Sequence, residues 1–434
     1  MPTFSIGPET RRVLFWSFIV LLFLIIGSFA VWYIFVLRQQ REVDALAAAR
    51  GFNSEIPAFT GSGGSMRENI SGFFQSAFES LTTGEDAPAE TSVAKNPTPR
   101  LWHANSIPAL GISLFGATTA TSSGSIRFLE RPSGNIFYKS IASGAEPVRI
   151  TNTLIPFIYD AQWINNDSLI VRHSEDNGIT MRTFIGSVVI STTTLASLST
   201  EYLEDGVTAF AIRPDHKEPS LFYLVQSPDG VIGISMESTG KNPKRLWSSP
   251  LVGWRVLWLN PDKIVLAQKA AAGIPGNIYT LSPTTKEMSL VIGGLAGLSA
   301  VLHPKEDALV YSTSENGVLK LFSRILGVVR ELPVITMADK CVWGEGRGLS
   351  LYCAVPTSLP KDLLPDAWYR GEVRLSDTWY KIDPVEGTAE VLLDPVNDFD
   401  VSIDVIDPLI NDSGGTIIFT DARSETPWLL KVAL

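Results

Sequence analysis

The segment Leu257-Trp258-Leu259, with the polar turn Pro261-Asp262-Lys263 and the run Ile264-Val265-Leu266, holds the pattern that decides the fold of this chain. Two short apolar runs separated by a turn rich in Pro and Asp predict a β-hairpin. Comparable units recur along the sequence, with a looser copy first: Ile112 to Leu129, Gln162 to Val171, Ala211 to Tyr223, Val301 to Tyr311, Val342 to Tyr352 and Val405 to Phe419. A unit repeated seven times indicates a repeat architecture.

A second hairpin follows most copies. Asn277 to Ile292, Thr378 to Leu393 and Asn135 to Thr151 each contain two strand-like runs around a turn. Two hairpins make a four-stranded unit, which is a propeller blade. Pro99 to Leu434 is 336 residues, or 48 for each of seven units, close to the ~40–50 of known blades. We therefore predict an all-β fold, a seven-bladed β-propeller over residues 99–434, with six or eight blades as open alternatives.

The repeats also carry a family resemblance. A turn with Pro and Asp after Trp or Leu, followed by a strand and then by Ile278-Tyr279-Thr280-Leu281-Ser282-Pro283, resembles TolB-type or WD40-like β-propeller repeats. The Gly-His and Trp-Asp dipeptides of the strict WD40 signature are missing, which argues against a WD40 partner repertoire. The resemblance implies a fold used by binding modules, sensors and accessory domains of peptidases.

The ends of the repeat region predict how the ring closes. The last unit stops one strand short, and an uncovered sheet edge is a liability. Pro99-Arg100-Leu101-Trp102 resembles Pro243 to Trp247, which occupies the position of a fourth strand in the third unit. We expect Arg100 to His103 to supply the missing outer strand.

The amino-terminal part predicts a membrane anchor. After a tail of residues 1–12, Val13 to Leu37 contains no charge in 25 residues, and 18 of them are Val, Leu, Ile or Phe. Such a length suits a transmembrane helix, and Trp16, Trp32 and Tyr33 lie near its ends, where aromatic side chains favour the interface. A signal peptide cleaved after Ala30 is the alternative. We expect a single-pass protein contacting the lipid bilayer through residues 13–37, with the carboxy-terminal domain outside the cytoplasm of a bacterial-type cell.

Residues 38–98 have the composition of a flexible linker. Within it, about residues 66–82, capping-box spacing at Ser65 precedes apolar residues at helical intervals, including Phe73, Phe74 and Phe78. This amphipathic helix is a candidate docking element for a partner protein or for the folded domain, and a marginal helix within a linker is the alternative.

Composition excludes several classes. Thirty-five Lys plus Arg against 45 Asp plus Glu give a net charge of −10, a poor match to nucleic acid. Two cysteines and four histidines are too few for a zinc module. Cys341 and Cys353 flank a hairpin that turns near Arg347, and a symmetric register places them directly opposite each other. Either a disulfide or a pair of buried thiols fits that position.

The sixth unit carries an insertion between Pro356 and Asp377 that includes Trp368 and Tyr369. Such residues offer a partner-binding surface, and they also suit a loop that folds back on its own blade. His103, His173, His216 and His303 occupy strand or turn positions and indicate structural roles. Asp398, Asp400, Asp404 and Asp407 suggest a solvated acidic edge, with a site for a hard cation such as calcium as the alternative, although their spacing matches no known calcium loop.

No sequence motif for nucleophilic, metal-dependent or phosphate-binding chemistry occurs, so we expect no catalytic residues, cofactor or metal site. The interpretation is a membrane-anchored, extracytoplasmic propeller that acts as a noncatalytic protein-binding or scaffolding module of the cell envelope. Two alternatives remain: a hydrolase or lyase with carboxylates in the propeller channel, and an accessory subunit of a secretion or pilus complex.

Overall fold

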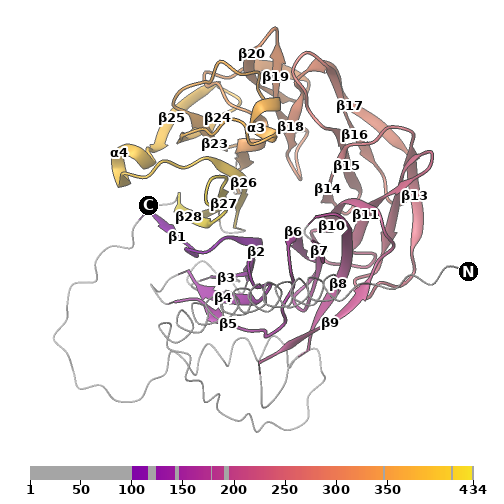
Figure 1. The fold of residues 1–434 in the computed structure, drawn as a ribbon. Helices are drawn as coiled ribbons and strands as arrows, with labels where there is room; N and C mark the ends of the chain where they lie inside the picture. Colours follow the sequence, from indigo (N-terminus) through magenta and orange to yellow (C-terminus); the bar gives the residue numbers. More distant parts are fainter. Residues whose placement is uncertain are drawn as a thin grey trace, which may run out of the picture. The chain divides into compact units, whose positions relative to one another are not determined.

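The computed structural model describes residues 100–432, except 116–123, 142–145, 177, 190–194, 346–347 and 412–413. Within these ranges the chain forms seven four-stranded antiparallel sheets arranged as blades around a ring (Figure 1). The prediction of a seven-bladed all-β propeller is confirmed.

Each blade is built from strands that neighbour one another in sequence, except the seventh. The first strands of blades 1 and 2, of blades 3 and 4, and of blades 6 and 7 contact each other, which places these strands at the inside of the ring. From inside to outside, the first four blades are β2 (Ala109–Phe115), β3 (Ser125–Glu130), β4 (Ile136–Ser140), β5 (Val148–Arg149); β6 (Ile158–Trp163), β7 (Ser168–Ser174), β8 (Met181–Val189), β9 (Ser197–Tyr202); β10 (Val207–Ile212), β11 (Leu221–Ser227), β12 (Gly230–Met236), β13 (Lys244–Ser249); β14 (Trp254–Asn260), β15 (Lys263–Gln268), β16 (Pro275–Leu281), β17 (Met288–Ala296).

The last three blades follow the same order. They are β18 (Ser299–Leu302), β19 (Ala308–Glu315), β20 (Val318–Ile325), β21 (Val328–Glu331); β22 (Cys341–Trp343), β23 (Leu351–Pro356), β24 (Asp377–Asp383), β25 (Thr388–Leu393); and β26 (Val405–Ile410), β27 (Thr416–Asp421), β28 (Pro427–Lys431), β1 (Leu101–His103). The hairpins expected from the sequence are the β-ladders of the structure, and the insertion occupies the expected interval between β23 and β24.

The hydrophobic core is divided among the interfaces between blades. Seven clusters of buried apolar side chains each join two neighbouring blades, and the seventh joins blade 7 to blade 1 through Ile418, Leu429, Ile126 and Phe128. Second strands supply near-continuous apolar runs, such as Leu169-Ile170-Val171, because both of their faces contact a neighbouring blade. Stability therefore depends on a complete ring.

The amino-terminal strand closes that ring, as predicted. Leu101 and His103 lie opposite Leu430 and Trp428 in an antiparallel ladder. Backbone hydrogen bonds extend the pairing at both ends: the Lys431 amide donates to the Arg100 carbonyl, and the Ala104 amide donates to the Pro427 carbonyl, both at 2.8 Å. The outer edge of β28 is therefore covered by a strand from the other end of the domain.

The described helices are short, and they lie between strands. They are a 3₁₀ turn, η1 (Ala338–Lys340), and two α-helical turns, α3 (Asp366–Tyr369) and α4 (Pro395–Phe399). In the described part of the chain no helix has the length and apolar character needed to cross a bilayer. The predicted span 13–37 with Trp16, Trp32 and Tyr33, and the predicted helix 66–82 with Phe73, Phe74 and Phe78, lie outside the described residues.

Candidate functional site: the loop face and the channel mouth

The strand directions divide the connecting loops between two faces of the ring. Because neighbouring strands alternate in direction, loops that precede first strands share a face with loops that join second and third strands. We call this the loop face. The loops that join first to second strands and third to fourth strands form the opposite face.

Large exposed apolar side chains concentrate on the loop face. Among the described residues outside strands, the opposite face exposes two of them, Leu326 and Val385. The loop face exposes eleven: Leu154, Phe157, Ile179, Leu251, Val252, Ile274, Ile335, Leu359, Leu363, Val396 and Phe399. Single exposed apolar residues need no explanation, so the feature that distinguishes this face is the one-sided distribution.

The insertion between β23 and β24 folds onto this face. Leu364, just before the turn α3, and Trp368 within it pack against Leu319 of blade 5 and Met337 of the segment between blades 5 and 6. It then reaches blade 4, where the Ala272 amide donates to Asp366 Oδ2 at 2.5 Å. In Figure 1, α3 lies close to β18 at the inner side of the ring. The insertion thus bridges blades 4 and 6.

A buried clamp fixes the insertion to blades 6 and 7. Lys340 has no exposed surface, and its Nζ donates to Asp377 Oδ2 at 2.6 Å, to Asp404 Oδ1 at 2.7 Å and to the Val405 carbonyl at 3.0 Å. Trp368 Nε1 donates to the same Asp404 carboxylate at 3.0 Å. The expectation of a solvated acidic edge is wrong for Asp404, because burial beside Lys340 and Trp368 takes it out of water.

A second network, the outer clamp, uses the residues adjacent to those of the buried clamp: Asp339 beside Lys340 in η1, and Tyr369 beside Trp368 in α3. Arg255 on β14 forms an ion pair with Asp339, and the Tyr369 hydroxyl donates to Asp339 Oδ2 at 2.7 Å. The Arg255 guanidinium also donates to the Tyr369 oxygen at 3.3 Å. Arg255 remains 51 % exposed. Consecutive residues of η1 and α3 therefore serve two networks, one buried and one open to water.

The charges of the outer clamp depend on one another. Burial opposes ionisation of Asp339, but Arg255 and the Tyr369 hydroxyl outweigh it and hold the pKa of Asp339 below its ordinary value. Asp339 in turn raises the pKa of Arg255. Burial, followed by Asp339, raises the pKa of Tyr369, so its hydroxyl stays protonated and remains a donor.

Two further carboxyl groups lie on inner strands of the ring. Asp407 on β26 has an exposed surface, and desolvation by the surrounding ring raises its pKa, with Arg255 opposing and Asp339 adding to the shift. Burial also raises the pKa of Asp160 on β6, with Arg172 opposing and Asp407 adding. Side chains on blades 2, 4 and 7 influence one another in this way only across the channel, so the channel mouth is charged.

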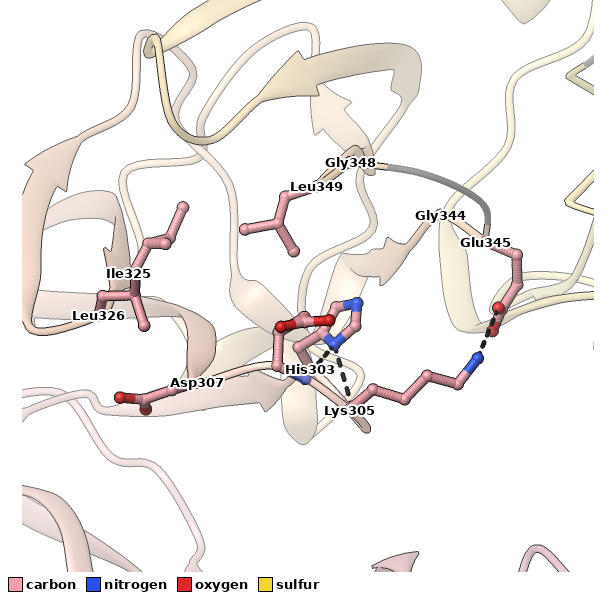
Figure 2. Close-up of a pocket in the computed structure, with 10 residues that line it drawn as sticks. His303, Lys305, Asp307, Ile325, Leu326, Gly344, Glu345, Gly348 and Leu349 are labelled. Carbon is pink, nitrogen blue, oxygen red and sulfur yellow. Dashed lines mark hydrogen bonds and ion pairs between the residues drawn. The ribbon is translucent and has the colours of Figure 1, made fainter.

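A separate cavity lies on the opposite face between blades 5 and 6 (Figure 2). Its volume is about 190 Å³, and Lys305 and Glu345 in its wall form an ion pair at 3.2 Å. His303 Nδ1 accepts from the backbone amides of Lys305 and Glu306, and burial lowers the pKa of His303. The polar groups of this wall bind one another and stabilise the turn.

The remaining histidines contact their own fold. His216 Nδ1 donates to the Ile164 carbonyl at 2.7 Å, and the His103 ring lies 3.6 Å from the ring of Trp428. His173 Nε2 lies 3.4 Å from the Tyr202 hydroxyl. Within the described ranges no group of three or more His, Cys, Asp or Glu side chains is arranged to hold a metal ion.

Cys341 and Cys353 lie directly opposite each other in the ladder between β22 and β23, which confirms the expected register. Both are buried, and the structure joins them in a disulfide. The two predicted partner-binding residues in the insertion are both half-buried. Trp368 belongs to the buried clamp and Tyr369 to the outer clamp. Their role toward a partner stays a prediction.

Sequence reasoning missed Lys340, Arg255, Asp339 and Asp160 as members of a common site. They come from three separate elements, η1, β14 and β6, and the local sequence of Arg255, Asp339 and Asp160 does not distinguish them from solvated surface charges. One available signal was Lys340 itself, next to the buried strand β22, where a charge requires a partner.

Comparison with known proteins found no matching family model and no matching curated protein. Solved structures do resemble the fold. The tricorn protease matches with 12 % identity and a TM-score of 0.46, over 78 % of this chain and 36 % of that one. Oligogalacturonate lyase from Vibrio parahaemolyticus matches with 8 % identity and a TM-score of 0.45, over 75 % of this chain and 98 % of that one.

TolB from Acinetobacter baumannii matches with 10 % identity and a TM-score of 0.37, over 74 % of this chain and 78 % of that one. This chain spans about a third of the tricorn protease chain. These similarities concern the fold alone. The seven four-stranded sheets, closed by the amino-terminal strand, identify the chain as a seven-bladed β-propeller.

Proposed function

We propose that this protein is a membrane-tethered protein-binding module of the cell envelope, and that it engages its partner through the loop face. The observation that carries the proposal is the one-sided distribution of exposed apolar side chains, eleven on the loops of this face against two on the other. Loops on a rigid scaffold commonly carry binding residues, and exposed apolar loop residues gain free energy when a partner covers them.

The position where the amino-terminal linker enters the ring is compatible with binding through the loop face. Leu101, at the start of β1, pairs with Leu430 near the carboxy-terminal end of β28. The loop that precedes β28 joins a second to a third strand and lies on the loop face. Leu101 therefore lies at the other end of the strand, toward the opposite face. A linker that precedes Arg100 therefore meets the ring away from the loop face.

The rigidity of the face also favours recognition of a partner. The buried clamp and the outer clamp hold the insertion across blades 4 to 7, so Leu359 and Leu363 are presented by a fixed loop. A surface that is already ordered loses little conformational entropy on binding. Crosslinking in native membranes tests the proposal.

In this experiment a photoreactive phenylalanine replaces Val252 or Phe399 on the loop face, or Leu326 on the opposite face as the matched control. We expect adducts with one shared protein from the two loop-face positions and none from position 326. Equal labelling from all three positions, or no adduct from the loop face, contradicts the proposal.

The membrane part has its own test. Deleting residues 13–37 is expected to release the protein from the membrane fraction, and protease added outside intact cells stripped of their wall is expected to degrade the propeller. A deletion variant that still sediments with membranes refutes the anchor, and complete protection of the propeller refutes the extracytoplasmic location.

The charged channel mouth bears on the alternative of a hydrolase or lyase. A catalytic site there would have to use Asp160 and Asp407, because Asp339 is engaged by Arg255 and Tyr369. A hydrolase or lyase that uses these carboxylates would lose its turnover in the variants Asp160→Asn and Asp407→Asn, whereas a binding module has no turnover to lose.

A further inference from the structure

The channel mouth at blade 2 has an apolar platform that the fold does not cover. Leu154, Phe157 and Tyr159 lie in the loop between β5 and β6 and at the start of β6, and they are 75 %, 49 % and 44 % exposed. We define these three residues as the platform. It is the part of the loop face that adjoins the channel carboxylates, because Asp160 follows Tyr159 directly.

The backbone under the platform is fixed. The Phe157 carbonyl accepts from the Ser174 amide at 3.1 Å, and the Arg131 guanidinium donates to the Ile158 carbonyl at 3.1 Å. Ile155 between the exposed side chains is buried, and its amide donates to the Ser133 carbonyl at 3.2 Å. The exposure of the three side chains is therefore set by a well-anchored loop.

Phe157 has a backbone conformation that its side chain does not favour. Its φ is 42°, in the left-handed region where bulky residues are rare. A Gly or Asn would adopt this backbone with less strain. The fold therefore holds an aromatic side chain in an unfavourable conformation and leaves about half of it in water, a combination found at recognition sites.

The charge around the platform is negative. The two neighbouring loops of blade 2 contribute the exposed carboxylates Glu175, Asp176, Glu204 and Asp205 and no Lys or Arg. Hydrogen bonds, first from Thr180 and then from Ser174, lower the pKa of Asp176 to about 2, so this carboxylate is ionised at neutral pH. The carboxyl groups of Asp160 and Asp407 lie on the channel side.

The nearby cations are already engaged. Arg131 pairs with Glu425, and Arg182 lies over the Tyr202 ring at 4.6 Å. Arg172 donates to the Thr208 carbonyl at 2.6 Å and forms an ion pair with Asp160 at 3.8 Å. Asp407 has no ion pair or hydrogen bond through its carboxylate among the described residues. The surface therefore combines exposed acidic loops and one carboxyl group without a direct partner in the described part of the chain, Asp407, with exposed apolar area.

We infer that the platform receives a segment of the partner protein that combines aromatic or aliphatic side chains with Lys or Arg, with the apolar side chains on Leu154, Phe157 and Tyr159 and a cation directed toward Asp160 and Asp407. This inference rests on the proposed function and deepens it, because it assigns the chemistry of the partner. Burial of apolar area supplies affinity, and charge complementarity selects basic segments over acidic ones.

A peptide selection tests the inference with defined probes. Random twelve-residue peptides displayed on phage are selected on the full chain in nanodiscs. We expect enriched peptides to have net positive charge and at least two aromatic or aliphatic residues. Their affinity should fall tenfold or more when Lys and Arg are exchanged for Glu, and it should weaken as salt is raised.

Amino-acid substitutions test whether an enriched peptide binds at the platform. Phe157→Asn keeps a residue that tolerates the left-handed backbone while removing the ring, and the double variant Asp160→Asn/Asp407→Asn removes the channel charges. Each is expected to weaken an enriched peptide at least tenfold, with a melting temperature near that of the unsubstituted protein. Leu326→Ser and Asp307→Asn on the opposite face are matched controls that should leave binding unchanged.

Enrichment of acidic or uncharged peptides overturns the inference, as does the absence of any enrichment or full binding by both platform variants. If loop-face crosslinks from Val252 and Phe399 persist in any of these cases, the proposed function stands and only the assigned chemistry fails. If the crosslinks also fail, the proposed function fails with it.

Discussion

Replacing Lys340 with Met should strongly destabilise the propeller, because Lys340 neutralises two buried carboxylates. The side chains of Lys340, Asp377 and Asp404 have at most 1 % exposure, and Nζ lies 2.6 and 2.7 Å from the two carboxylate oxygens. Removing one partner of a buried ion pair costs about 3–5 kcal/mol. The entropy of unfolding is about 0.7 kcal/mol/K for a domain of about 330 residues, so the melting temperature should fall by about 4–7 °C.

The loss should depend on pH in a defined direction. Burial raises the pKa of Asp377 above its ordinary value, and Lys340 is the main group that opposes this shift. Without Lys340 the pKa rises further, so the folded variant binds protons that the unfolded chain does not. A raised carboxyl pKa leaves stability intact below the unfolded-state pKa near ~4 and removes it as pH rises toward the folded-state value. The deficit of Lys340→Met is therefore smaller at acidic pH than at neutral pH.

Tryptophan fluorescence during thermal and urea unfolding measures this deficit. Lys305→Met is the matched control, since Lys305 is 70 % exposed in its pair with Glu345 and such a pair is worth about 1 kcal/mol or less. The triple variant Lys340→Met/Asp377→Asn/Asp404→Asn should recover part of the loss. A melting temperature within about 1 °C of the unsubstituted protein at neutral pH, or a deficit that grows at acidic pH, would refute the reasoning.

Three further predictions concern closure, the cysteines and the outer clamp. Deleting Arg100 to His103, or truncating after Ala422, should lower the melting temperature sharply, because each change uncovers an edge of blade 7; unchanged melting in both proteins contradicts closure. Reduction of the denatured protein should add the mass of two hydrogens if Cys341 and Cys353 form the disulfide, and Cys353→Ser should then cost about 2–4 kcal/mol; an unchanged mass means free thiols. Arg255→Met should destabilise the protein by about 1–3 kcal/mol near neutral pH. The lowered pKa of Asp339 stabilises the fold above the ordinary carboxyl pKa and loses that contribution as pH falls. Equal deficits at pH 7 and at strongly acidic pH would show that Arg255 does not act through Asp339.

The repeat pattern predicted the architecture well because its information is local. In each blade, apolar alternation and turn residues specify a hairpin within about 20 residues, as in the ladder between β14 and β15. The pairing of Cys341 with Cys353 followed from the same symmetry around a turn. The closing strand at Arg100 was predictable because its sequence copies that of another fourth strand.

The site was less predictable because its members come from different blades. Asp404 was expected at a solvated edge, and the structure places it in the buried clamp with Lys340 and Trp368. A carboxylate in a loop has the same local sequence whether water or a lysine side chain faces it. The turn α4 shows the opposite case, since Asp394 as the N-cap and Pro395 at the first helical position are local signals in the sequence that predict a helix start.

The amino-acid sequence by itself determined the strands, their pairing into hairpins and the way the ring closes, and it favoured seven blades over six or eight, because these features arise from alternation and turn chemistry over short distances. Only the tertiary structure decided which polar side chains meet: Arg255 with Asp339 and Tyr369, and Lys340 with Asp377 and Asp404. The physical reason is that closure of the ring brings together residues as far apart in sequence as Arg255 and Tyr369, which are 114 positions apart. Their electrostatic partners and their burial exist only once that closure has taken place.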